Sequence, residues 1–336
     1  MKQPEFRTNN FDLLRLIAAI QVIVDHYFQH LAIPVSPFAQ KLIYLFPGVP
    51  VFFIISGYLV SASYERNPAL LTYFRNRALR IFPGLWCCIL VTILVISLTG
   101  TSFLNKQTIT WLPAQFAGFI YTPGFLRDYG FGSYNGSLWT IPIELQFYLL
   151  LPLVYFLVIK RLPHYWLYVL TGIFIGLNLV SLSVSFGERT DKLLTYSFFP
   201  HFYLFLAGVV FQRIRLYRLP FIFNKAAYWL TAYILFSLLL QERMPLPLFL
   251  VAKNLVLACC VISMAYTLPG AAVKLLRHND ISYGIYIYHG LILAVIVEEK
   301  LRSSINIFVV ILLSCILAYI SWIFIERPFI LRKRKF

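Results

Sequence analysis

Residues 11–31 read FDLLRLIAAIQVIVDHYFQHL, and this stretch decides the fold class because it is apolar enough to enter a membrane. It nevertheless contains Arg15, Asp25 and His26. An ionisable side chain at bilayer depth costs about 2.5–3.5 kcal/mol on insertion scales, so three in one span indicate a function that keeps them there. Arg15 and His26 lie eleven residues apart, nearly on one helix face and separated by about 16 Å along the axis. The stretch therefore predicts a membrane helix with a cation and an imidazole along one wall.

The rest of the chain has the composition of a polytopic membrane protein. Of its 336 residues, 60% are hydrophobic and only 12% are charged, whereas a soluble protein has a charged fraction of about 25%. No polar linker separates a second folded domain, so residues 1–336 are expected to form a single transmembrane domain, an all-α bundle of about ten helices. Apolar windows of helical length predict these helices near residues 11–32, 48–64, 81–100, 138–159, 165–185, 196–212, 222–240, 247–267, 281–297 and 305–325.

The basic residues predict the orientation of these helices. If the amino terminus is inside, the inner segments hold 19 Lys and Arg residues and the outer loops hold 8. The positive-inside rule therefore places both termini in the cytoplasm. The net charge of +16 is spread over short clusters between apolar runs, so membrane topology accounts for it and nucleic acid is not an expected partner.

Five segments in order along the chain resemble motifs of the acyltransferase-3 family of membrane acyltransferases. The first segment is FDLLRLIAA, which is followed by His26. One position departs from the family pattern, because Leu145 stands where many members have a second acidic residue. The other four segments are VPVFFIISGYLVSASYERNPALLTYFRNRALRIFPGLW at 49–86, SLWTIPIELQFYLLL at 137–151, SYGIYIYH at 282–289 and ERPF at 326–329.

The resemblance implies transfer of an acyl group, commonly acetyl from acetyl-CoA, to a hydroxyl of a glycan such as a cell-surface polysaccharide. It implies a multi-pass protein of the bacterial cytoplasmic (inner) membrane, surrounded by membrane lipids, with acyl-CoA as co-substrate and no permanently bound cofactor. Some members carry a fused esterase-like domain, which is not expected here. By motif, the family's functional residues fall on Arg15, His26, Ser56, Gly57, Arg77, Arg80, Ser137, Trp139 and Glu144.

Acyl transfer to a hydroxyl needs a base near the acceptor, and His26 is the candidate. The alternative is a buried histidine bonded to a carbonyl. Asp25 points about 100° away from His26, so we expect Glu144, on another helix, to orient the ring, unless Glu144 forms a structural ion pair. His30 has the spacing of a two-histidine metal pair with His26, but no HExxH carboxylate or third ligand accompanies it, so no metal is expected.

Donor binding is predicted at the arginines near the inner surface. Coenzyme A carries several phosphates, and guanidinium groups bind phosphate bidentately, so Arg77 and Arg80, with Arg15, are donor candidates; topology alone also supplies arginines here. Ser56 and Gly57 suit either a thioester contact or close helix approach.

Substrate contacts are expected at Ser137, Trp139 and His289, although packing explains His289 equally well. The aromatic loop at residues 101–137 has the composition of a sugar-binding lid and also that of an interfacial belt. Two other functions use the same residues or helices. One is a transporter or flippase for a lipid-linked sugar, and the other is a non-catalytic subunit of a glycan-assembly complex.

Overall fold

The computed structural model describes Phe6 and residues 8–332. The regular structure in this part of the chain is helical, and its only β-type pairing is an isolated bridge between Gly130 and Ser133. The chain forms two compact units. The first comprises the described residues up to 18 with residues 45–73 and 143–278, and the second comprises residues 19–44, 74–142 and those from 279 onward. Each unit is thus assembled from segments that are distant in the sequence.

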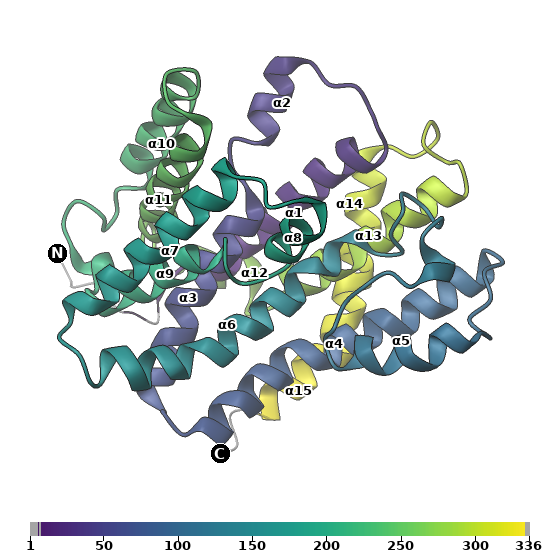
Figure 1. Cartoon of the computed structure of the whole chain (residues 1–336), viewed down its shortest axis with the longest axis horizontal. Helices are drawn as coiled ribbons and strands as arrows, with labels where there is room; N and C mark the ends of the chain where they lie inside the picture. Colours follow the sequence, from purple (N-terminus) through teal and green to yellow (C-terminus); the bar gives the residue numbers. More distant parts are fainter. Residues whose placement is uncertain (1–5, 7, 333–336) are drawn as a thin grey trace. The chain divides into compact units, whose positions relative to one another are not determined.

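The first unit is built around the packing of α3 against α9, and α10 lies beside α11 within it (Figure 1). Its elements are α3 (Gly48–Arg66), most of α6 (Thr140–Val154), a π-helical turn (Tyr155–Ile159), α7 (Tyr165–Ser183), α8 (Glu188–Thr195), α9 (Phe202–Arg213), a 3₁₀ turn (Leu216–Arg218), α10 (Ala226–Leu240), α11 (Leu246–Ala265) and α12 (Ala271–Leu276), together with the first part of α1 (Phe11–His30).

The second unit is built around α13, which packs against α14 (Figure 1). Its elements are the second part of α1, α2 (Pro37–Ile43), most of α4 (Leu70–Leu98), α5 (Lys106–Phe116), 3₁₀ turns at Gly124–Leu126 and Gly136–Trp139, α13 (Ser282–Glu298), α14 (Ile307–Ser321), a π-helical turn (Trp322–Glu326) and α15 (Arg327–Leu331).

The helices agree with a multi-pass membrane protein. Within the described residues, six helical segments are long and apolar enough to cross a membrane, and α9, α10 and α13 are shorter apolar helices. A helix lies in each of the ten predicted windows, while α1, with its charged residues, is not among the six. The six segments are Pro37–Arg66, Leu70–Leu98, Gly136–Ile159, Tyr165–Ser183, Leu246–Ala265 and Ile307–Leu331. The all-helical membrane fold is therefore confirmed, and the number of spans and the side of the termini stay predictions.

The arginine-rich segment after α3 is helical, although the sequence indicated a loop up to residue 80. The helix α4 begins at Leu70, directly after Pro68 and Ala69, and carries Arg77 and Arg80 in its first half. Oδ1 of Asn67 accepts a hydrogen bond from the backbone N of Ala69 across 3.2 Å, which shapes the turn between the two helices. The helix starts early because good helix formers such as Leu, Arg and Ala follow the proline.

The long connection 101–137 is folded and not an open loop. It contains α5, and Trp111 and Tyr134 are buried against each other in an edge-to-face contact with ring centroids 5.5 Å apart. Phe119 and Tyr121 remain exposed. Part of the aromatic composition of this connection therefore forms its own small core.

Candidate active site

Two histidines from distant parts of the chain meet in the second unit. His26 comes from α1 and His289 from α13, and Nδ1 of His26 lies 3.0 Å from Nε2 of His289. The His289 side chain is fully buried, whereas that of His26 is partly exposed. The two rings thus form a hydrogen-bonded pair in which His26 is the more accessible member.

The hydrogen-bond network assigns the tautomer of each ring. Nδ1 of His289 lies 3.2 Å from the carbonyl oxygen of Ile285, and a carbonyl can only accept. A neutral His289 therefore carries its proton on Nδ1 and accepts through Nε2. His26 consequently donates through Nδ1, and its lone pair lies on Nε2. This arrangement leaves Nε2 of His26 ready to take a proton while His289 holds the ring.

A buried amide braces α13 beside His289. Nδ2 of Asn135 donates to the carbonyl oxygen of Ile287 across 2.8 Å, and Oγ of Ser137 donates to Oδ1 of Asn135 across 2.6 Å. A Cβ at Gly290 would lie 2.2 Å from Oδ1 of Asn135, so glycine is required for this approach. Ser137, predicted as a substrate contact, is fully buried. In this position it supports the helix that carries His289.

The folded connection covers the other histidine of α1. The His30 ring stacks on Phe131 with centroids 3.9 Å apart and an interplanar angle of 5°, and its centroid lies 4.8 Å from that of His26. Among the residues that the structure describes, no group of three or more His, Cys, Asp or Glu side chains could hold a metal ion. Because the Phe131 ring stacks on His30, it forms an apolar wall beside the imidazoles.

Arg80 connects α4 to the beginning of the helix that carries His289. Its Nη2 donates to Oδ2 of Asp280 across 2.6 Å. The other carboxylate oxygen of Asp280 accepts from the backbone N of Ser282, the first residue of α13, across 3.3 Å. Glu326 of the ERPF segment is buried and interacts electrostatically with both members of the ion pair. A phosphate at Arg80 would compete with a carboxylate that already binds it, and Arg77 lies one turn earlier on α4.

In the first unit, Gly57 lies where α3 and α9 approach closely. A Cβ at Gly57 would be 2.0 Å from the carbonyl oxygen of Phe205, and one at Gly208 would be 2.3 Å from that of Ile54. The interpretation of Gly57 as a site of close helix approach is therefore what the structure shows. The neighbouring Ser56 has a buried Oγ with no hydrogen-bond partner among the described residues.

Arg15 and Glu144 each contact a residue of their own helix. Arg15 pairs with Asp12 at 3.7 Å on α1, and Glu144 accepts a hydrogen bond from Tyr148 on α6. Trp139 ends the 3₁₀ turn before α6. The first unit contains Arg15, Ser56, Gly57 and Glu144, and the second contains His26, Arg77, Arg80, Ser137, Trp139 and His289. Within the second unit, the structure brings His26 and His289 into direct contact.

Comparison with known families gives these residues a common context. The acyltransferase-3 family, described as "Acyltransferase domain", matches residues 8–326. The chain belongs to this family. The match extends from before Arg15 to Glu326, so it takes in the candidate residues of every motif segment that the sequence analysis singled out. The protein is an O-acyltransferase, and it is similar to relatives named as O-acetyltransferases.

Three relatives illustrate the range of the family. Nodulation protein 10 of Rhizobium leguminosarum bv. viciae is 32% identical to the acyltransferase over 346 residues, which cover 95% of this chain and 92% of the relative. The exopolysaccharide production protein ExoZ of Rhizobium meliloti is 26% identical over 85% of this chain and 90% of its own. The O-acetyl transferase of Shigella phage Sf6 is 32% identical over 43% of this chain and 45% of its own. No solved structure matches the chain.

Sequence reasoning missed two partners in the second unit of the acyltransferase. It named Glu144 as the residue that orients His26, whereas the structure shows His289 hydrogen-bonded to that ring. It also missed Asp280 as the ion-pair partner of Arg80. These partners are separated by 263 and 200 residues, and no spacing within one helix reports such a contact. The one available signal was that His289 and Asp280 are polar residues in or beside an apolar helix.

Proposed function

We propose that this O-acyltransferase moves an acyl group, acetyl in the first instance, from cytoplasmic acyl-CoA to a hydroxyl of an extracytoplasmic or lipid-linked glycan, in the bacterial cytoplasmic membrane. The observation that carries the proposal is the His26–His289 pair, in which one nitrogen of His26 keeps a lone pair and the other is held by a buried acceptor. General-base catalysis needs such a nitrogen within reach of the proton that it removes.

The names of relatives support a glycan acceptor. One is an exopolysaccharide production protein, another is a phage O-acetyl transferase, and a third is the peptidoglycan O-acetyltransferase OatA of Listeria monocytogenes, which is 26% identical over 45% of this chain and 26% of its own. For this chain we propose an acceptor of the same chemistry, a hydroxyl on a sugar.

In the proposed reaction, Nε2 of His26 removes the proton of the acceptor hydroxyl while that oxygen attacks the thioester carbonyl carbon. The new C–O bond forms and the C–S bond breaks, and the imidazolium returns its proton to the departing CoA thiolate. His289 contributes by keeping the proton on Nδ1 of His26, because its Nε2 continues to accept from the charged ring. His289 is thus a positioning residue, and His26 is the catalytic base.

Arginines are proposed to bind the donor, because each phosphate of coenzyme A suits a guanidinium. Arg77 and Arg15 keep this role in the proposal. For Arg80, the carboxylate of Asp280 at 2.6 Å favours a structural contribution to the position of α13. Glu144 is retained as a candidate catalytic residue from its motif.

The test uses full-length protein purified in detergent, incubated with acetyl-CoA and a polysaccharide from the host. We expect acceptor-dependent release of CoA and a mass gain of one acetyl group on the glycan, both abolished by His26→Ala. His164→Gln is the matched control, because His164 is exposed and lies at the start of α7. Surface glycans that are identical with and without the gene, together with no release of CoA, would contradict the proposal.

A further inference from the structure

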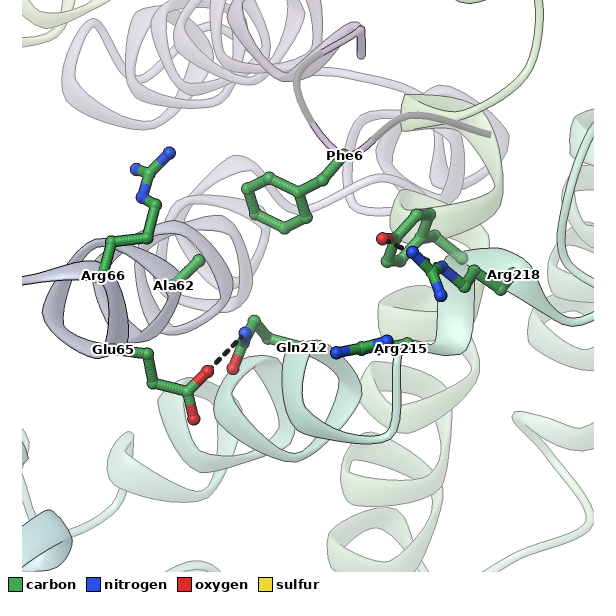
Figure 2. A pocket seen from close by; sticks show the side chains of 8 residues that line it. Phe6, Ala62, Glu65, Arg66, Gln212, Arg215 and Arg218 are labelled. Atoms are coloured by element: carbon green, nitrogen blue, oxygen red, sulfur yellow. Dashed lines mark hydrogen bonds between the residues drawn. The ribbon is translucent and has the colours of Figure 1, made fainter. Parts of the chain in front are cut away.

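The first unit contains a cavity of about 350 Å³ between the carboxyl-terminal ends of α3 and α9 and the 3₁₀ turn Leu216–Arg218 (Figure 2). Three arginines, Arg66, Arg215 and Arg218, line it. None of them belongs to the residues on which the proposed chemistry rests. Small-molecule sites have volumes of about 300–1,000 Å³, so the cavity holds a compact ligand or one end of a longer ligand.

The cavity has an excess of positive charge. Its one acidic residue, Glu65, accepts a hydrogen bond from Nε2 of Gln212 across 2.9 Å (Figure 2). Glu65 also pairs with the guanidinium of Arg213. Arg66 and Arg215 form no ion pair with any residue in the described part of the chain, and all three lining arginines are exposed. Guanidinium groups bind phosphate through paired N–H donors, so this charge favours a ligand with phosphates.

One side of the cavity is aromatic. Phe6 contacts Tyr217 edge-on with centroids 5.9 Å apart, and it stacks on Tyr58 at 5.7 Å and 12°. Tyr217 in turn stacks on Tyr266 at 4.7 Å. Tyr217 is buried, and its hydroxyl accepts a hydrogen bond from Nε of Arg218 across 3.2 Å, so Phe6 is the aromatic side chain left to contact a ligand in the cavity. Aromatic side chains that line a basic groove bind nucleobases by stacking.

The backbone conformation of Arg215 also favours a ligand-binding role for this residue. Its φ of 53° lies in the left-handed region at the end of α9, where glycine is the usual residue. Figure 2 shows the Arg215 side chain beside that of Gln212 among the residues that line the cavity. Basic residues at helix ends also match the helix dipole and the predicted cytoplasmic side. These two effects explain the sign of the charge, but they do not require a cavity with an aromatic wall.

We propose that this cavity binds the phosphorylated adenosine end of the acyl-CoA donor, with the adenine at Phe6 and the 3′-phosphate at Arg66, Arg215 and Arg218. The inference rests on the proposed function, which requires a CoA thioester. At about 350 Å³, the cavity takes the nucleotide and leaves the pantetheine arm outside it.

The experiment measures binding of CoA, adenosine 3′,5′-bisphosphate and pantetheine to full-length protein in detergent by calorimetry. Arg66→Gln, Arg215→Gly and Arg218→Gln should each weaken CoA and the bisphosphate about tenfold, the usual effect of losing one hydrogen bond to a charged group. Pantetheine should bind equally to all variants. Arg215→Gly is the sharpest variant because glycine suits the positive φ and the fold should survive, as an unchanged melting temperature would verify. Arg161→Gln, an exposed arginine of the same unit, is the matched control and should leave CoA binding unchanged.

Two outcomes overturn the assignment of the cavity. One is wild-type CoA affinity in all three variants while the wild-type protein still transfers acetyl from acetyl-CoA. The other is lost binding to phosphatidylglycerol nanodiscs with unchanged CoA affinity, which would identify a lipid headgroup site. A wild-type protein that neither binds CoA nor releases it from acetyl-CoA would instead refute the donor in the proposed function.

Discussion

His26 donates a hydrogen bond through Nδ1 to Nε2 of His289 across 3.0 Å, and His289 in turn donates to the carbonyl oxygen of Ile285. The chain of two imidazoles ends on a backbone carbonyl, so the proton positions follow from the fold of α13. The side chain that orients the proposed base is thus a neutral ring and not a carboxylate. A neutral partner sets the tautomer and orientation of His26 without adding a charge to a buried region.

Substitution of His26 and substitution of His289 should lower kcat by different factors. His26→Ala is expected to lower kcat by about 10²–10⁴-fold, the range for a general base, with CoA affinity unchanged. His289→Phe should lower kcat by about 10²-fold, because the ring of His26 loses its orientation, and His289→Gln should restore part of this loss by offering an acceptor oxygen. Steady-state kinetics on purified variants provides the measurement. Equal loss of CoA affinity in the His26 and His289 variants would show that both residues are structural.

The ion pair at the start of α13 should contribute to stability. Asp280 is 8% exposed, and removing one partner of a buried pair costs roughly 3 kcal/mol. We expect Arg80→Ala to lower the melting temperature in detergent, and the double variant Arg80→Gln with Asp280→Asn to recover part of the loss. Arg77→Ala should instead weaken CoA binding. An unchanged melting temperature in Arg80→Ala would favour donor binding as the sole role of Arg80.

Close helix contact should make Gly57 intolerant of any side chain. Gly57→Ala would place a Cβ 2.0 Å from a backbone oxygen of α9, and such overpacking costs about 1–3 kcal/mol. Gly176→Ala on α7 is the control, because a Cβ at Gly176 would have no neighbour within 4 Å among the described residues and alanine is the better helix former by about 1 kcal/mol. Thermal unfolding should therefore separate the two variants in opposite directions. Equal melting temperatures would argue against the contact between α3 and α9.

Cysteine labelling tests the predicted orientation. Leu104, before α5, is 98% exposed, and Leu71, at the start of α4, is 84% exposed. An impermeant maleimide added to intact cells should label Leu104→Cys, and it should label Leu71→Cys only after permeabilisation. The protein without an added cysteine provides the background from its five native thiols. The reverse pattern would place the cavity at Arg215 on the side opposite to cytoplasmic CoA.

Direct transfer and a covalent relay make different predictions for His26. In direct transfer the acceptor hydroxyl attacks the thioester, whereas a nucleophilic His26 would form an acyl-imidazole first and give ping-pong kinetics. We expect no label on the His26 peptide after incubation with radiolabelled acetyl-CoA and no acceptor, because donor and acceptor are proposed to meet at one ring. Stoichiometric label that passes to added acceptor would replace the direct mechanism with the relay.

The sequence by itself determined the membrane class, the approximate helices and the family. Apolar length decides whether a segment enters a bilayer, and a helix satisfies its own backbone hydrogen bonds, so both properties are local. Because these properties are local, the sequence predicted the helix boundaries less accurately. The arginines before residue 81 belong to α4, and the aromatic connection is folded and contains a helix of its own. The motif spacing also selected His26, Arg80 and Gly57 as residues of interest.

Only the tertiary structure decided what these residues contact. His289 beside His26, Asp280 beside Arg80 and Phe205 against Gly57 are contacts between separate segments of the chain. Which helices pack together depends on the fit of whole side-chain surfaces, to which residues hundreds of positions apart contribute. The periodicity of a single helix has no information about its neighbour, and for that reason the sequence identified the proposed base but not the imidazole that holds it.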